Sequence, residues 1–92
     1  MLNQVIIVGR IKQVYADCFE VLIPGANHSK DTLVRVYCSD TIMDNVKAYV
    51  SIDSVVGVRG RLENDETQSL CVIGDKITFL SSAKEVNTDG NE

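Results

Sequence analysis

The 92-residue sequence contains no tryptophan, one proline and one histidine, and its basic residues are fewer than its acidic ones. Its longest uninterrupted apolar runs have four residues. A membrane-spanning helix needs about 20, so we expect a chain that does not cross a bilayer. The single proline and six glycines exclude collagen-like and low-complexity classes. A hydrophobic content of 45% excludes wholesale disorder, and the length fits one domain.

Charge gives no support for nucleic-acid binding when it is taken over the whole chain. Nine basic and 13 acidic residues give a formal net charge of -4, whereas proteins that bind nucleic acid are more often basic. The acids, however, gather in residues 63–66 and 85–92, away from the four arginines. A local basic surface is therefore compatible with the sequence.

The sequence offers little for metal binding or catalysis. Its three cysteines, Cys18, Cys38 and Cys71, are widely spaced, and His28 has no cysteine or second histidine within metal-ligand spacing. We expect reduced, buried thiols, a cytoplasmic protein, and no metal or cofactor. There is no glycine-rich phosphate loop and no local signature of a catalytic Ser-His-Asp or Cys-His arrangement. These absences favour a binding protein over an enzyme.

Five segments have the composition of β-strands, and they are separated by turn-forming or polar residues. Gly9 lies inside the first segment and predicts a bulge or a sharp bend there. The last segment is interrupted at residues 74–75, so the pattern predicts either one strand or a bent pair. The predicted strands cover residues 5–12, 18–23, 32–38, 55–63 and 70–80.

One helix is predicted between the third and fourth strands. Ser39 and Asp40 offer an N-cap, and apolar residues then recur at helical spacing. The helix should have roughly three turns and pack its apolar stripe on the sheet. That stripe consists of Ile42, Val46, Tyr49 and Val50. The same kind of pattern places Phe79, like Tyr49, in the core, and alternation with Val21 and Ile23 favours a core position for Phe19 as well.

The order of three strands, one helix and two strands is that of the oligonucleotide/oligosaccharide-binding (OB) barrel. The predicted fold class is therefore all-β, a five-stranded OB-fold barrel with one helix between strands three and four. We expect the OB-fold domain to cover residues 1–80. Residues 81–92 are polar and acidic, and we expect them to form a disordered tail.

Four stretches of the sequence resemble motifs of one known family. Residues 1–11 resemble its opening, MLN-R-V-x-L-V-G-R-L, and residues 45–50 resemble its helix end, N-V-x-x-Y-L. Residues 54–62 resemble the strand S-x-V-x-V-x-G-R-L, and residues 75–80 resemble the closing D-x-V-x-F-L. The matches occur in the family's order, and the family that the sequence resembles is that of bacterial and phage single-stranded DNA-binding proteins. Segment 63–67 is short and acidic where the family's loop is long and basic, so the resemblance is to a short, divergent member.

Single strands are bound by cationic side chains that follow the phosphates and by aromatic rings that stack on bases. Arg35 and Tyr37 share one strand face, Arg59 and Arg61 share another, and Arg10 and Lys12 leave the first strand on a common side. Tyr15 lies in the turn before the second strand. Each of these side chains is also consistent with ordinary exposure to solvent and no role in binding. The candidate nucleic-acid-binding residues are Arg10, Lys12, Tyr15, Arg35, Tyr37, Arg59 and Arg61.

The resemblance implies sequence-tolerant binding of single-stranded DNA in replication, recombination or repair, and a homo-oligomer that is a dimer or tetramer. The net negative charge and the lack of tryptophan leave a second hypothesis open. The chain would then be an OB-fold adaptor that binds replication proteins of a primosome-type complex, with weak or no DNA binding.

Overall fold

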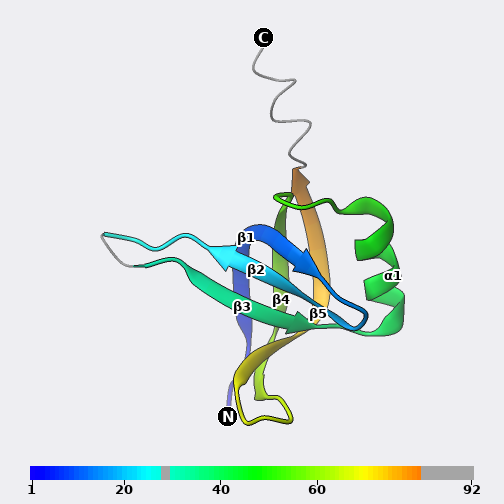
Figure 1. Cartoon of the computed structure of the whole chain (residues 1–92). Helices are drawn as coiled ribbons and strands as arrows, with labels where there is room; N and C mark the ends of the chain where they lie inside the picture. The colour runs from blue at the N-terminus through cyan, green and yellow to red at the C-terminus, as the bar shows by residue number, and fades with distance from the viewer. Residues whose placement is uncertain (28–29, 82–92) are drawn as a thin grey trace.

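The computed structural model describes residues 1–27 and 30–81, so His28 and the acidic tail after Ser81 lie outside the described residues. The described chain forms five strands and one helix in the predicted order (Figure 1). Each bound of a strand lies within two residues of its prediction. Strand β5 also includes Ser81, the first residue of the segment that we expected to form the tail. The elements are β1 (Val5–Val14), β2 (Cys18–Ile23), β3 (Thr32–Tyr37), α1 (Asp40–Tyr49), β4 (Val55–Asn64) and β5 (Leu70–Ser81).

The strands form a closed barrel in the order β1-β2-β3-β5-β4, which confirms the predicted five-stranded OB barrel. The β3–β5 pairing is parallel and all others are antiparallel. Strand β1 closes the barrel because its first half pairs with β4 and its second half with β2. Its two halves meet at Arg10, which has a partner in each neighbouring strand.

We expected a bulge or a sharp bend at Gly9, and the bulge lies further along β1. The register between β1 and β2 shifts between Ile11 and Gln13. Gly9 serves a different purpose, since a Cβ atom at this position would lie 2.4 Å from the carbonyl oxygen of Leu22. The glycine is needed because β2 crosses β1 too closely for any side chain.

The interruption in the last segment is a bulge within one strand. Arg59 of β4 pairs with Lys76, and Gly60 pairs with Gly74, so Asp75 is the extra residue on β5. At Gly60 a Cβ atom would lie 2.0 Å from the carbonyl oxygen of Ile73. The close approach of β4 and β5 therefore requires glycine at this position.

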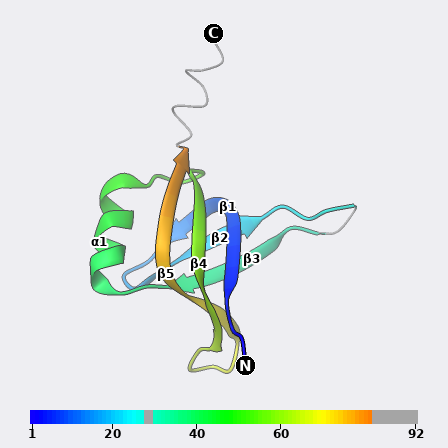
Figure 2. The ribbon, with the colours of Figure 1, turned by 180° about the vertical axis from the view of Figure 1, so that it is seen from behind.

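Helix α1 begins as predicted and covers one side of the barrel, whereas the β2–β3 hairpin extends away on the other (Figures 1 and 2). The Ser39 hydroxyl accepts a hydrogen bond from the Ile42 amide at 3.4 Å, which caps the first turn. The Lys47 ammonium group donates to the carbonyl oxygen of Ala16 at 2.9 Å. This bond ties the last turn of the helix to the turn between β1 and β2.

The expectation that Tyr49 and Phe79 belong to the core is wrong. Their exposed fractions are 73% and 45%. The helix buries Val46 of the predicted stripe together with Met43, and Ile42 and Val50 pack against the same core. Tyr49, the last residue of the helix, is the member of the stripe that is exposed. Phe79 lies near the end of β5, and its ring centroid is 6.4 Å from that of Tyr49. The two rings therefore cover each other at the rim of the barrel.

The barrel interior is filled by aliphatic side chains from every element around one aromatic ring, that of Phe19, which is fully buried as expected. The three cysteines are free. Cys18 and Cys71 are buried, and burial raises the pKa of the Cys38 thiol to about 11. The thiols therefore remain protonated near neutral pH. No helix among the described residues is long and apolar enough to span a membrane.

Candidate nucleic-acid interface

Three of the predicted site residues lie close together, namely Arg35 and Tyr37 on β3 and Tyr15 in the β1–β2 turn. Arg35 stands opposite Glu20 across the two strands, and their side chains form an ion pair at 3.2 Å. The guanidinium carbon also lies 5.6 Å from the ring centroid of Tyr15, within the range of a cation–π contact. Hydrogen bonding to Tyr37, and secondarily to Glu20, raises the pKa of Arg35. Arg35 therefore lies between Glu20 and the ring of Tyr15 and shares a face of β3 with Tyr37.

An open groove of about 620 Å³ lies between this surface and the loop that joins β4 to β5. Arg35 and Tyr37 line one wall, and residues 64–67 line the other. Ile73 of β5 and Asp17 of the β1–β2 turn also line it. We call this space the Tyr37 groove, because Tyr37 is its aromatic residue.

The β4–β5 loop is held in shape by Asp65. One oxygen of its carboxylate accepts hydrogen bonds from the Thr67 amide at 2.8 Å, the Thr67 hydroxyl at 2.7 Å and the Ser69 amide at 3.1 Å. These bonds, with the Thr67 hydroxyl first, hold the pKa of Asp65 below its usual value, and Arg35 across the groove contributes in the same direction. The loop thus presents an ionised carboxylate to the groove at neutral pH.

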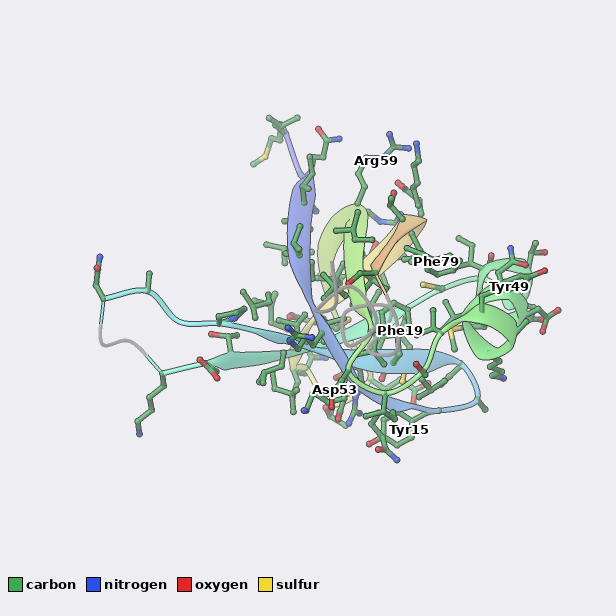
Figure 3. All side chains as sticks on the ribbon, turned by 90° about the horizontal axis from the view of Figure 1, so that it is seen from above. Tyr15, Phe19, Tyr49, Asp53, Arg59 and Phe79 are labelled. Carbon is green, nitrogen blue, oxygen red and sulfur yellow. The ribbon has the colours of Figure 1, made fainter. Side chains whose placement is uncertain are left out.

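Arg10 and Lys12 leave β1 on a common side, as predicted, and both contact Asp53 in the turn after α1. Lys12 forms an ion pair with the Asp53 carboxylate at 2.7 Å, and Arg10 donates to the Asp53 carbonyl oxygen at 3.0 Å. The hydrogen bond from Lys12 lowers the pKa of Asp53. Figure 3 places Asp53 and Tyr15 on the same side of the barrel. These two cations therefore flank the surface that bears Tyr15.

Arg59 and Arg61 are exposed on β4 but do not line the Tyr37 groove. Arg61 pairs in register with Ile73, which in turn pairs with Tyr37, so Arg61 lies two strands, or roughly 10 Å, from Tyr37. Arg59 lies on the opposite side of the barrel from Tyr15 (Figure 3). The structure therefore brings together five of the seven candidates, places Arg61 at their margin and separates Arg59.

Four of the candidate cations are already paired with carboxylates of the same chain. Besides the pairs at Lys12 and Arg35, Arg59 pairs with Asp75 at 3.2 Å and Arg61 pairs with Glu63. The pairs of Lys12, Arg59 and Arg61 are exposed on both sides, and such pairs contribute only about 0–1 kcal/mol each, so a phosphate group can displace these three carboxylates at small cost. The Glu20 carboxylate that pairs with Arg35 is more buried. The net charge of -4 does not reveal this pairing, because it counts the charged residues and not their neighbours.

Sequence reasoning missed the other residues that line the groove, namely Asp17, Asn64, Asp65, Glu66, Thr67, Cys71 and Ile73. The sequence marks the acidic segment only as a departure from a basic loop. Its place opposite Tyr37 follows from the parallel pairing of β3 with β5, which no local pattern encodes. Within residues 1–27 and 30–81, no group of three or more His, Cys, Asp or Glu side chains is arranged to hold a metal ion.

By sequence, the chain matches no protein-family model and no curated protein. By structure, it is similar to a mitochondrial single-stranded DNA-binding protein from S. cerevisiae, Rim1, with a TM-score of 0.78 at 14% identity over 90% of this chain and 98% of that one. The second single-stranded DNA-binding protein of Mycobacterium smegmatis gives a TM-score of 0.73 at 19% identity, covering 86% and 89% of the two chains.

A small single-stranded DNA-binding protein from Streptomyces coelicolor gives the same TM-score of 0.73 at 16% identity, covering 87% of this chain and 95% of that one. All three likenesses extend over most of both chains, but their identities lie below 20%. What they establish is the architecture: this chain has the OB fold of single-stranded DNA-binding proteins.

Proposed function

We propose that the protein binds single-stranded DNA without strict sequence requirement, as a binding protein rather than an enzyme. The observation that carries this proposal is the surface on which Tyr15 of the β1–β2 turn lies beside Arg35 of β3, with Tyr37 on the same face of β3 and Arg10 and Lys12 at its flank. Rings that can stack on bases stand beside cations that can reach phosphates, which is the combination that single strands require. The fold shared with single-stranded DNA-binding proteins supports the same assignment.

The proposed path of the strand crosses β1, β2 and β3 and ends at the Tyr37 groove. Arg10 and Lys12 would contact phosphates at one end of this path, and Arg61 at the other. Arg59 would take part only when the strand is long enough to pass around the barrel, because it lies on the opposite side from Tyr15. A role in cytoplasmic replication, recombination or repair is part of this proposal.

Binding to oligo(dT) is expected to be tighter than binding to duplex DNA of the same length, and to weaken as salt rises. Each neutralised phosphate of a single strand releases about 0.7 counterion, so three to four contacts predict a slope of roughly -2 to -3 in log affinity against log salt. A fluorescence-anisotropy titration at several salt concentrations measures both quantities. Equal affinity for duplex, or no binding at low salt, contradicts the proposal.

A protein-interaction adaptor is the second candidate function, and the acidic character of the surface favours it. Every ion pair named above places a carboxylate beside a candidate cation, and the chain carries a net charge of -4. A partner from a replication complex that offers basic residues would meet these carboxylates favourably. The oligo(dT) titration separates the two functions, since an adaptor of this kind binds DNA weakly or not at all.

The protein is expected to form a homo-oligomer through β1. Leu2, Ile6 and Val8 are exposed. The first half of β1 pairs with β4 along one edge, and its other edge has no partner strand among the described residues before Arg10. A second copy could cover both the edge and these side chains. Light scattering at micromolar concentration should give a mass of two or four times 10.1 kDa. Ile6→Lys should lower that mass, and a wild-type mass of one chain contradicts the expectation.

A further inference from the structure

The Tyr37 groove carries charges that suit a base better than a phosphate. Three carboxylates line it, those of Asp17, Asp65 and Glu66. Its one cation, Arg35, already pairs with the half-buried Glu20 carboxylate. A phosphate inside the groove would therefore meet an excess of like charge at close range, whereas a base carries no net charge.

Tyr37 is the aromatic residue that lines the groove, so a base that stacks on its ring would have residues 64–67 of the opposite wall as neighbours. Carboxylates accept hydrogen bonds but donate none when ionised. They therefore match the exocyclic amino group of cytosine, and they oppose the carbonyl oxygen that thymine and uracil carry at the same ring position.

Glu66 and Asp17 are the carboxylates available for this contact. One oxygen of Asp65 already holds the loop through Thr67 and Ser69. Among the hydrogen bonds and ion pairs of the described part of the chain, none involves the Glu66 side chain. Its carboxylate can turn toward a base without breaking an existing bond.

We propose that the Tyr37 groove selects nucleotides whose base bears an exocyclic amino group, with cytosine favoured over uracil and thymine. This inference rests on the proposed function, and it adds a base preference to binding that is otherwise tolerant of sequence. Arg10 and Lys12, which lie outside the groove, supply the phosphate contacts common to all bases.

The test compares oligo(dC) with oligo(dU) of equal length by anisotropy titration in the same buffer. Both bases are pyrimidines of nearly the same size and neither carries a methyl group, so stacking is matched and the edge differs. The full chain is expected to bind oligo(dC) at least about five-fold more tightly, the lower end of the discrimination that a good base-edge contact gives.

Two variants assign the preference to the groove. Glu66→Gln and Asp17→Asn replace an obligate acceptor with an amide that both donates and accepts, so the ratio of the two affinities should fall toward one. Asp44→Asn makes the same charge change on the exposed surface of α1 and should leave the ratio unchanged.

Each result has one meaning. Equal binding of the two oligomers by the unaltered chain overturns the inference and leaves the proposed function standing. A preference that survives both Glu66→Gln and Asp17→Asn overturns its assignment to this groove. Failure of both oligomers to bind at low salt removes the proposed function itself. If a short Lys- and Arg-bearing peptide then binds and Glu66→Gln weakens that binding, the groove is a protein site.

Discussion

Phe19→Ala is expected to lower the free energy of unfolding by about 3–5 kcal/mol, as large-to-small changes of a buried phenylalanine do. Phe19 is fully buried at the centre of the barrel, where side chains from β1, β3, β4, β5 and α1 join the same cluster. A domain of this size has a total stability of about 5–15 kcal/mol, so the change removes a large share of it.

Phe79→Ala is the matched control, because the same atoms are removed from a side chain that is 45% exposed. It should cost less than half as much, since a smaller apolar area returns to water and no enclosed cavity forms. Urea titration followed by far-UV circular dichroism gives both values from the midpoints at a constant m-value. Equal losses for the two variants would show that Phe19 is not the centre of the core.

Much of the fold could be predicted because each element carries its own local signal. β-Branched residues mark the strands, Pro24 and Gly25 end β2 at the predicted residue, and the change to helical spacing after Ser39 marks α1. These signals depend on neighbouring residues only, which is why the bounds agree closely. The order of the elements then limited the topology to the OB barrel.

Burial at the rim could not be predicted in the same way. Tyr49 and Phe79 continue apolar periodicities, but periodicity shows only which direction a side chain takes and not how far the barrel extends. Tyr49 is the last residue of α1, and Phe79 is the third residue from the end of β5, so both lie near the ends of their elements. The position of the rim depends on how the strands are staggered, a property of the closed barrel.

The composition of the site also depended on long-range pairing. The face shared by Arg35 and Tyr37 follows from alternation within β3, and the structure preserves it. The contact of Arg35 with Glu20 needs the β2–β3 register, and the separation of Arg59 from Tyr15 needs the closure of β1 on β4. Local patterns therefore identified the side chains but not their neighbours.

Tyr37→Ala is expected to weaken oligo(dT) binding by about 1–3 kcal/mol, the contribution of one stacked base. This is roughly a five- to 150-fold rise in Kd. Tyr37 is the aromatic residue of the groove, whereas the ring of Tyr15 does not line the groove and is already in contact with Arg35. Tyr37→Phe keeps the stacking face and should retain most of the affinity.

Tyr49→Ala is the control for Tyr37→Ala, since it removes the same side chain from an exposed position on α1 outside the groove. It should leave the affinity for oligo(dT) unchanged. Because Tyr37 is half-buried, thermal melts of each variant must show a folded protein at the temperature of the titration. A folded Tyr37→Ala variant that binds like the parent would show that β3 is not the binding surface.

The salt dependence distinguishes stacking from phosphate contact. Tyr37→Ala removes no charge, so the slope of log affinity against log salt should stay as in the parent chain. Lys12→Ala removes one phosphate contact, so affinity should fall and the slope should shrink by about 0.7. Arg59→Ala should change neither quantity for a short oligomer, because Arg59 lies on the opposite side of the barrel from Tyr15. A slope reduced by Arg59→Ala but not by Lys12→Ala would place the strand on β4 instead.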